Sequence, residues 1–343
     1  MAYPNVAPYG SWKSPITPDV VAAGEVGLEQ IRLDGSDVYW IERRSKEGGR
    51  KVIVRRSADG QVTDMTPVGF NARTRVHEYG GGDYAVSNGM IILSNFADQR
   101  LYVQRPGLEP RPLTPAADIR YADGFIDHRR NLFFCVREDH TGHGEAINTL
   151  VSIDLQAEDP GKILMSGNDF YSSPRLSPDG SRLAWLTWNH PNMPWDGTEL
   201  WVGKLTGDGS IGEAVRVAGS INESISQPEW SPEGSLYFVS DRSGWWNIYR
   251  WQDEKVEPLC PMDAEFGQPQ WVFASALYGF ASERRIVCSY TKNGRDYLAT
   301  LDTQTRALTD IELPFTAISQ VRAAGNRVVF IGASSTEPNI IAL

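Results

Sequence analysis

The sequence has few cysteines, no long apolar run and no excess of basic residues. The three cysteines are far apart and odd in number, so they predict neither a disulfide framework nor a metal-binding knuckle. No run of 18 apolar residues is present, and we therefore expect no membrane span. The formal net charge of −10 argues against a nucleic-acid partner, because a phosphate backbone would require a basic face.

The first residues also lack the features of a secretory signal. Residues Met1–Ser14 are polar and Pro-rich, without a basic start or an apolar stretch. Together with the unpaired cysteines, this favours a reducing, cytoplasmic location. We expect no cofactor and no bound metal.

What the sequence has in abundance is turn residues and large aromatic side chains. It contains 32 Gly, 21 Pro, 11 Trp and 13 Tyr, a composition typical of many short strands joined by tight turns. Seven segments share one form, a turn followed by a short apolar strand; Leu33-Asp34-Gly35 before Val38–Ile41 is the first. The seven turn positions lie 41 to 54 residues apart: Gly35, Gly89, Arg130, Gly180, Gly234, Arg284 and Gly325.

Each unit continues with a third strand, and six units continue with a fourth. Four strands every ~40 to 50 residues is the period of a β-propeller. A β-sandwich or another array of hairpins is the alternative. We predict an all-β, seven-bladed propeller over residues 25–343, preceded by an N-terminal extension over residues 1–24, because seven registers agree and no helical pattern intervenes.

The last unit is one strand short. Its third strand is Asn339–Ala342, and the sequence ends at Leu343. Either the segment Ile16–Ala23 supplies a fourth strand, or the outer edge of the last blade is open. An open edge invites pairing with another chain, so self-association through this edge is a possible interaction.

Two repeats and three further stretches resemble a known family. Leu176–Trp185 and Trp230–Arg242 are similar to the propeller repeats of TolB-like proteins and of the prolyl oligopeptidase family. Arg75–Gly82, Val136–His140 and Trp188–Thr198 narrow the resemblance to the N-terminal propeller of bacterial dipeptidyl aminopeptidases and acylaminoacyl peptidases. The resemblance covers nearly the whole chain.

In that family an α/β-hydrolase domain carries the Ser-Asp-His triad, and these 343 residues contain no such domain. A nucleophile elbow requires Gly-x-Ser-x-Gly between a strand and a helix. The closest segment, Asp208–Gly212, begins with Asp and lies between two short strands, so we interpret it as a turn. The resemblance therefore implies no catalytic residue in this chain and no activity of the chain alone, with the hydrolase domain as its partner.

The long connections indicate where a site would lie. The connection Pro67–Gly82 and the loops Arg137–Asn148 and Trp188–Thr198 should share one face of the ring, where rigid scaffolds commonly carry function. In the resembled family such a face meets the hydrolase domain and helps to shape the substrate pocket. The candidate substrate-binding residues are Arg75, His77, Glu78, Tyr79, Trp195 and Asp196.

Each candidate has a structural alternative. Glu78 could pair with the α-amino group of a peptide and an Arg with its carbonyl or carboxylate, or the segment could form a buried network that pins two blades together. Gly80–Gly82 favours such close backbone approach, and Asp196 is equally suited to a turn. His140, His143 and Glu145 fit a solvated loop better than a metal site.

Two functions follow as hypotheses. The first is the substrate-gating propeller of a serine exopeptidase acting on short peptides, which admits peptides and excludes folded proteins. The second is a stand-alone TolB-like propeller that serves as a protein-binding scaffold. The peptide specificity, including a free or an acylated N-terminus, is open at this point.

Overall fold

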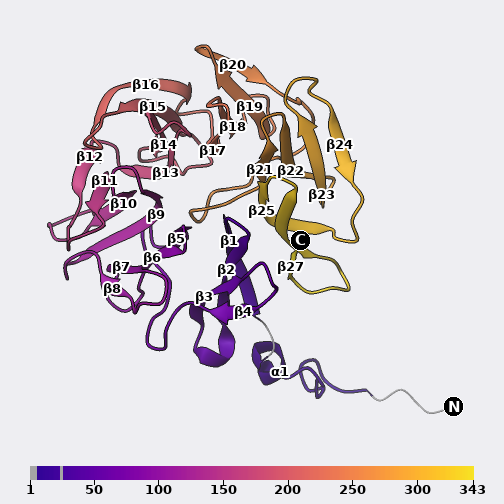
Figure 1. The fold of residues 1–343 in the computed structure, drawn as a ribbon. Helices are drawn as coiled ribbons and strands as arrows, with labels where there is room; N and C mark the ends of the chain where they lie inside the picture. The colour runs from indigo at the N-terminus through magenta and orange to yellow at the C-terminus, as the bar shows by residue number, and fades with distance from the viewer. Residues whose placement is uncertain (1–5, 24–25) are drawn as a thin grey trace.

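The computed structural model describes residues 6–23 and 26–343, and its propeller is built from β-strands. Seven antiparallel sheets surround a common axis (Figure 1). Six sheets have four strands and the seventh has three. The prediction of a seven-bladed propeller with an incomplete last blade is therefore confirmed. We number the blades 1 to 7 along the chain.

The first four blades follow one another in the order of the sequence. Blade 1 is β1 (Val26–Asp34), β2 (Asp37–Arg44), β3 (Arg50–Arg56) and β4 (Val62–Asp64), with a short 3-10 turn η1 (Ser45–Glu47); blade 2 is β5 (Tyr84–Ser87), β6 (Met90–Ser94), β7 (Leu101–Gln104) and β8 (Arg111–Pro112); blade 3 is β9 (Ile119–Asp127), β10 (Leu132–Asp139), β11 (Ile147–Asp154) and β12 (Lys162–Met165); and blade 4 is β13 (Phe170–Leu176), β14 (Arg182–Trp188), β15 (Glu199–Leu205) and β16 (Ile211–Gly219).

The remaining blades complete the ring. Blade 5 is β17 (Ile225–Trp230), β18 (Leu236–Ser240), β19 (Asn247–Gln252) and β20 (Lys255–Pro258); blade 6 is β21 (Tyr278–Ser282), β22 (Arg285–Lys292), β23 (Arg295–Asp302) and β24 (Leu308–Ile311); and blade 7 is β25 (Ala317–Ala324), β26 (Arg327–Ala333) and β27 (Ile340–Ala342). In every blade, each strand pairs with the next one along the chain. This local connectivity is what makes the repeat visible in the sequence.

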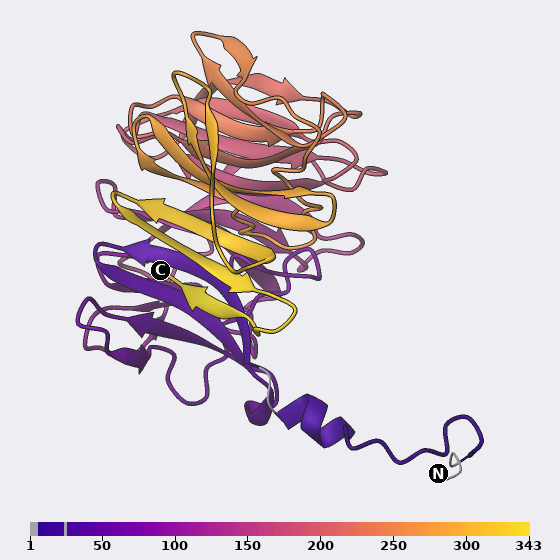
Figure 2. The same ribbon diagram turned by 90° about the vertical axis from the view of Figure 1, so that its right-hand side faces the viewer.

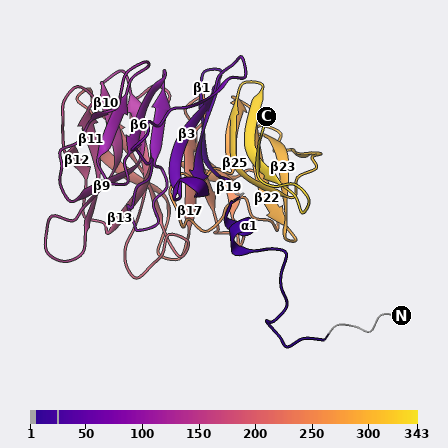
Figure 3. The same ribbon diagram turned by 90° about the horizontal axis from the view of Figure 1, so that it is seen from below.

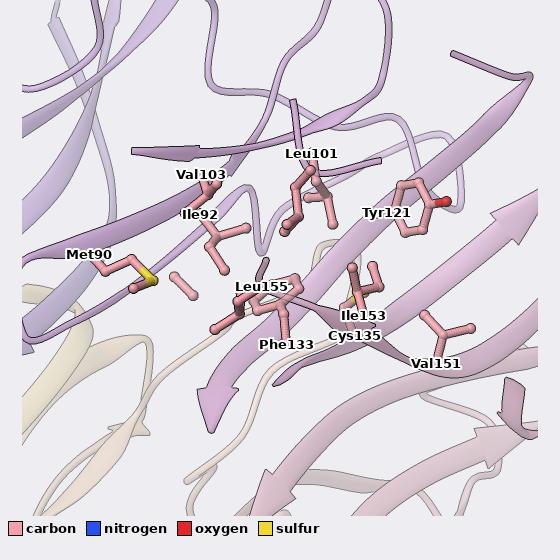
Figure 4. Close-up of a cluster of buried hydrophobic side chains, with 12 residues drawn as sticks. Met90, Ile92, Leu101, Val103, Tyr121, Phe133, Cys135, Val151, Ile153 and Leu155 are labelled. Carbon is pink, nitrogen blue, oxygen red and sulfur yellow. The ribbon is translucent and has the colours of Figure 1, made fainter. Parts of the chain in front are cut away.

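The core lies between the blades rather than inside a single one. Figure 4 shows one cluster, in which Ile92 and Val103 of blade 2 pack against Phe133 and Val151 of blade 3. Each blade is a single sheet, so one face must be buried against each neighbour, and alternate residues of a strand serve the two faces. Burial of this apolar area supplies the main driving force for stacking the blades.

The first strand of five blades bulges at the same place. One residue in each of these strands adopts a left-handed conformation, with φ between 45° and 54°, and the pairing register with the second strand shifts there. A bulge bends the strand and re-aims the side chain of the extra residue. These five bulge residues are Gln30, Asp123, Ser173, Gln227 and Gln320.

Three of the bulge residues, namely Gln30, Asp123 and Gln227, hydrogen-bond to the following blade. The Nε2 atom of Gln30 donates to Oδ2 of Asp83 at 2.5 Å, and its Oε1 accepts from the backbone N–H of Asp83 at 2.9 Å. Gln227 makes the same two-way contact with the backbone of Leu277 and Tyr278, at 2.7 Å in both directions. Polar contacts near the axis thus link blades whose outer parts are joined by apolar packing.

Blade 7 closes the ring against blade 1 without exchanging a strand. Strands β25 and β1 lie side by side (Figure 3). Ile31 and Val52 of blade 1 share a buried cluster with Val329 and Ile331 of blade 7. In addition, Nε of Arg322 donates to the backbone oxygen of Ile31 at 3.1 Å. The seam between the two ends of the propeller is therefore held by side chains.

The N-terminal segment does not supply the missing strand. Pro18–Ala23 forms a short helix, α1, outside the ring of blades (Figure 2). Thr17 Oγ1 accepts from the backbone N–H of Val20 at 3.2 Å, and Pro18 is the first helical residue, a combination that favours a helix start. Of the two alternatives for the last blade, the described residues show the open one, because no strand among them pairs with the outer edge of β27.

Two further sequence interpretations can be compared with the structure. In the segment Asp208–Gly212, the first three residues belong to the turn between β15 and β16, and the last two begin β16. The backbone N–H of Gly209, a residue with a φ of 78°, donates to the oxygen of Thr206 at 3.1 Å. The interpretation as a turn is confirmed. Within residues 6–23 and 26–343, no helix has the length and apolar character that crossing a bilayer requires.

The seam between blades 7 and 1 can be tested with a cavity-forming substitution. Ile31 is fully buried there, and Ile31→Ala should lower the free energy of unfolding by about 2–5 kcal/mol, through lost burial and the cavity left behind. Urea unfolding followed by tryptophan fluorescence measures it. Val62→Ala, in the exposed strand β4, is the control and should change stability by less than about 0.5 kcal/mol. Equal effects of the two substitutions would contradict closure through this seam.

Candidate functional site

The three long connections meet around one cavity. The cavity has a volume of about 620 Å³ and is lined from the connection before blade 2, from the loops of blades 3 and 4, and from the first strands of blades 4 and 5. The prediction that these connections share a face is confirmed. A fourth wall, formed by residues 268–277, comes from a segment that the sequence analysis did not single out.

This fourth segment, residues 259–277, joins blade 5 to blade 6, and we call it the strap. It crosses the ring, reaching blades on the opposite side (Figure 1). The backbone N–H of Phe273 donates to the oxygen of Gly80 at 3.0 Å. At the next residue, the backbone oxygen of Ala274 accepts from Nε2 of Gln320 in blade 7 at 3.3 Å. The strap therefore closes one side of the cavity and spans the axis of the propeller on this face.

The strap can approach because the connection before blade 2 is made of glycine there. A Cβ atom on Gly81 would lie 2.6 Å from the backbone oxygen of Phe273, and one on Gly82 would lie 2.7 Å from the Cα atom of Asp123. No side chain fits at such distances. The expectation that Gly80–Gly82 permits close backbone approach is confirmed.

The turn just before these glycines is held in a costly conformation. His77 and Glu78 have φ values of 52° and 65°, which L-residues with a full side chain rarely adopt. Glu138 accepts from the backbone N–H of His77 at 2.7 Å. Arg120 binds both carboxylates, with distances of 2.8 Å to Glu78 and 3.1 Å to Glu138. Blade 3 thus fixes the loop that carries the candidate residues.

The ring of His77 lies among aromatic side chains. Its centroid is 5.1 Å from that of Phe170, 5.4 Å from that of Trp188 and 4.8 Å from that of Phe273. Burial lowers the pKa of His77 to about 4, although Glu138 and Asn148 act in the opposite direction. The imidazole is therefore neutral at pH 7 and serves as a hydrogen-bonding group rather than as a cation.

The rim of the cavity is acidic. Glu78, Glu145 and Asp169 line it and face solvent. The hydrogen bond and charge of Arg120 lower the pKa of Glu78. Hydrogen bonds from the backbone and ring of His190 lower the pKa of Asp169. The rim therefore carries negative charge over the whole neutral range, an environment that attracts a cationic group.

Exposed aromatic side chains continue outward from the rim. The ring of Trp271 on the strap lies 4.4 Å from that of Trp195 and 5.5 Å from that of Tyr79. Tyr79 is 62% exposed and Trp271 is 53% exposed, and Val272 and Met193 are also exposed beside them. An apolar patch of this kind marks a contact surface more often than a freely solvated one.

The structure brings four of the six predicted residues together. His77, Glu78, Tyr79 and Trp195 line the cavity. Arg75 is not among the lining residues; its guanidinium lies 5.8 Å from the ring centroid of Phe96. Asp196 is also absent from the lining, and its Oδ2 accepts from the backbone N–H of Met193 at 2.9 Å. This contact agrees with the turn alternative for Asp196, and a contact of Asp196 with a substrate stays a prediction.

Several lining residues escaped the sequence analysis. Trp271 and Phe273 belong to an irregular loop without strand periodicity, and its only signal was the long interval between the fourth strand of blade 5 and the first strand of blade 6. Asn148 and Ser172 sit within strands and carry no motif of their own. Their placement depends on which strand ends surround the axis, and that is a property of the assembled ring.

Comparisons with solved structures relate this geometry to known proteins. A puromycin hydrolase is 34% identical to the chain, with a TM-score of 0.91 over 98% of the chain. A puromycin-hydrolyzing peptidase of Mycobacterium tuberculosis is 36% identical, with a TM-score of 0.90 over 98% of the chain. The propeller matches propeller domains of peptidases. An acylaminoacyl peptidase of Pyrococcus horikoshii, at 13% identity and a TM-score of 0.65 over 92% of the chain and 50% of its own length, shares the fold.

The match covers only part of the length of these solved structures. The chain spans about half the length of the puromycin-hydrolysing structures, namely 54% of each. No protein-family model matches the chain, and no curated protein matches it.

The contact between strap and glycine turn can be tested at Gly81. Gly81→Ala should displace the strap, because the new methyl group would overlap the backbone of Phe273 and because the φ of 88° is unfavourable for alanine. We expect the amide proton of Phe273 to exchange with solvent at least about tenfold faster. Gly142→Ala is the control, since a Cβ atom there meets nothing within 4 Å. Unchanged exchange in Gly81→Ala would contradict the close approach.

The depressed pKa of His77 predicts a pH-dependent stability. The unfolded chain binds a proton at His77 near pH 6.5, whereas the folded chain does so only near pH 4. The stability contributed by neutral His77 is therefore complete above about pH 6.5 and is lost as the pH falls toward 4. Between pH 7 and pH 4.5, the wild type should lose about 1–3 kcal/mol more than His77→Gln does.

Urea unfolding at the two pH values measures this difference. His128→Gln, at an exposed histidine in the turn of blade 3, is the control and should retain the wild-type dependence. If the His77→Gln profile coincides with that of the control, the imidazole is not held neutral by its surroundings.

Proposed function

We propose that the chain is the substrate-gating propeller of a serine exopeptidase that acts on short peptides, similar to dipeptidyl aminopeptidases and acylaminoacyl peptidases. The observation that carries the proposal is the match to puromycin-hydrolysing peptidases at 34–36% identity over 98% of the chain. Catalysis would come from an α/β-hydrolase domain that acts as the partner of the propeller. The chain by itself should not hydrolyse peptides.

The exposed aromatic patch suits the contact with such a domain. Tyr79, Met193, Trp271 and Val272 are partly exposed around the cavity, so a domain seated on this face would bury them and enclose the cavity. The catalytic groups would then face the acidic rim. This arrangement supports a substrate pocket shared between the two partners.

The shape of the cavity supports selection by size. The strap spans the ring, and His77 with its aromatic neighbours fills the inner side. A volume of about 620 Å³ accepts a few residues of extended peptide and no folded domain. The gate would thus be the cavity and its rim.

The rim charge favours a peptide with a free α-amino group. Glu78, Glu145 and Asp169 present carboxylate oxygens there, and a protonated amine gains charge-assisted hydrogen bonds from such groups. An acetylated peptide loses the charge and keeps only one of the three N–H donors. We therefore propose recognition of the free N-terminus.

Peptide binding tests this function directly. The chain should bind the tripeptide Phe-Gly-Gly with a change in tryptophan fluorescence, because Trp188, Trp195 and Trp271 line the cavity. The N-acetylated tripeptide should bind about 3–10-fold more weakly, which corresponds to about 0.7–1.4 kcal/mol. Isothermal titration calorimetry measures both affinities, and an assay with the chain alone should detect no cleavage.

A charge-matched pair of variants provides the control. Glu78→Gln should reduce the preference for the free amine, whereas Glu109→Gln, an exposed change outside the cavity lining, should leave it unchanged. If neither peptide binds, the proposed function is wrong and a protein-binding scaffold becomes the better reading. Cleavage by the isolated chain would contradict the need for a partner domain.

A further inference from the structure

Three buried polar atoms in the wall of the cavity have no hydrogen-bond partner. They are Nε2 of His77, Oδ1 of Asn148 and Oγ of Ser172. Asn148 and Ser172 are only 4% and 5% exposed. Buried polar atoms are normally paired, and an unpaired one costs about 1–3 kcal/mol. Three such atoms in one cavity wall indicate a place where a ligand completes the hydrogen bonds.

The three side chains come from neighbouring positions of the fold. Asn148 pairs across β10 and β11 with Glu138, the same residue whose carboxylate accepts from the backbone of His77. Ser172 lies two residues after Phe170 on β13, so both side chains project from the same face of that strand. The ring of Phe170 contacts that of His77. All three residues line the same cavity, and we call this part of its lining the inner wall.

The hydrogen-bonding capacity of the inner wall is defined by the contacts of its members. Nδ2 of Asn148 donates to the backbone oxygen of Asp169 at 2.9 Å, which leaves Oδ1 as an acceptor. The Asn148 side chain interacts with the ring of His77, and the two lone pairs of Oδ1 leave it able to accept from a ligand as well. The hydroxyl of Ser172 can donate or accept. His77 is neutral at pH 7, as derived above, and provides one donor or one acceptor. A ligand group facing this wall needs at least one donor and one acceptor.

The inner wall is unsuited to a charged group. Its nearest carboxylate, Glu138, already accepts from the backbone of His77, from Arg120 at 3.1 Å and from the ring of His140 at 2.6 Å. A cation or an anion placed there would lose its water without finding a free countercharge, which is strongly unfavourable. The charged rim and the neutral inner wall therefore recognise different parts of a ligand.

We propose that the inner wall binds a neutral peptide group of the substrate, whose N–H donates to Oδ1 of Asn148 and whose C=O accepts from the hydroxyl of Ser172. This inference rests on the proposed function, because it takes a short peptide as the ligand of the cavity. With the α-amino group at the rim, the group read by the inner wall is the first peptide bond. The aromatic rings around His77 provide a flat apolar surface beside it.

The test replaces one hydrogen-bond donor in the ligand. Phe-Gly-Gly is compared with its ester analogue, in which oxygen replaces the N–H of the first peptide bond. Calorimetry with the wild-type chain should show the ester binding at least about tenfold more weakly. Asn148→Leu should bind the two ligands with equal affinity, because the acceptor for the N–H is gone.

Two further variants keep the outcome interpretable. Ser172→Ala should weaken the peptide and the ester to the same degree, so their ratio stays at the wild-type value. Thr187→Val is the matched control, since Thr187 also has a buried hydroxyl without a partner but does not line the cavity. It should change neither affinity.

The results separate this inference from the proposed function. If the peptide binds and the ester binds equally well to the wild type, the inner wall does not read the peptide N–H, while the proposed function stands. The same conclusion follows if Asn148→Leu retains the wild-type ratio. If the wild type binds neither ligand, the proposed function is wrong and the inference fails with it. Should Asn148→Leu not fold, the wild-type ratio and the Ser172→Ala ratio still decide.

Discussion

The propeller depends on a bulge repeated near its axis. In five blades, one residue of the first strand turns into the left-handed region. Three of these residues hydrogen-bond to the next blade, as Gln30 does to Asp83 and Gln227 does to the backbone of Leu277. Apolar packing between blades tolerates sliding, whereas a two-way hydrogen bond fixes one register. Two of the bulge residues, Ser173 and Gln227, also line the cavity. The same bulges therefore belong both to the scaffold of the propeller and to the lining of the cavity.

The side of the site that is formed by the strap and the glycine turn relies on a second constraint, which is contact between loops far apart in the chain. The strap meets the glycine turn only because Gly81 has no side chain, and the strained turn at His77 is held by Glu138 and Arg120 of blade 3. Strain of this kind persists where the surroundings over-determine the conformation. The cavity is thus preorganised by contacts from blades 2, 3 and 6, which favours binding a ligand without a large rearrangement.

The fold could be predicted from the sequence because its information is local. Asp-Gly and Asn-Gly turns such as Asp34-Gly35 and Asn88-Gly89 mark several of the hairpins, and successive strands pair. Residues of the site could be predicted from the sequence only where a motif marked them, as at His77 and Trp195. The strap could not be predicted, since an irregular loop has no periodicity. The hydrogen bond between His77 and Glu138 could not be predicted either, because the two residues lie 61 positions apart in the chain. Asp196 shows the converse difficulty, because its sequence context fits a turn as well as a ligand contact, and its carboxylate accepts from the backbone of its own turn.

The division of charge around the cavity suggests how recognition and stability are related. Rim carboxylates stay solvated while the cavity is empty, so they cost the fold little, but water also screens their attraction for a ligand. The inner wall is the opposite case, because its unpaired polar atoms lower the stability of the empty fold. A hydrogen bond from a ligand in this low-dielectric environment would recover the hydrogen-bonding free energy that these atoms lost on burial. Affinity that depends on a correctly placed peptide bond would then come from the inner wall. The rim would mainly attract and orient the charged end. A ligand that satisfied the rim alone would bind weakly, and this difference is the physical basis on which the cavity can discriminate between short peptides and other cations.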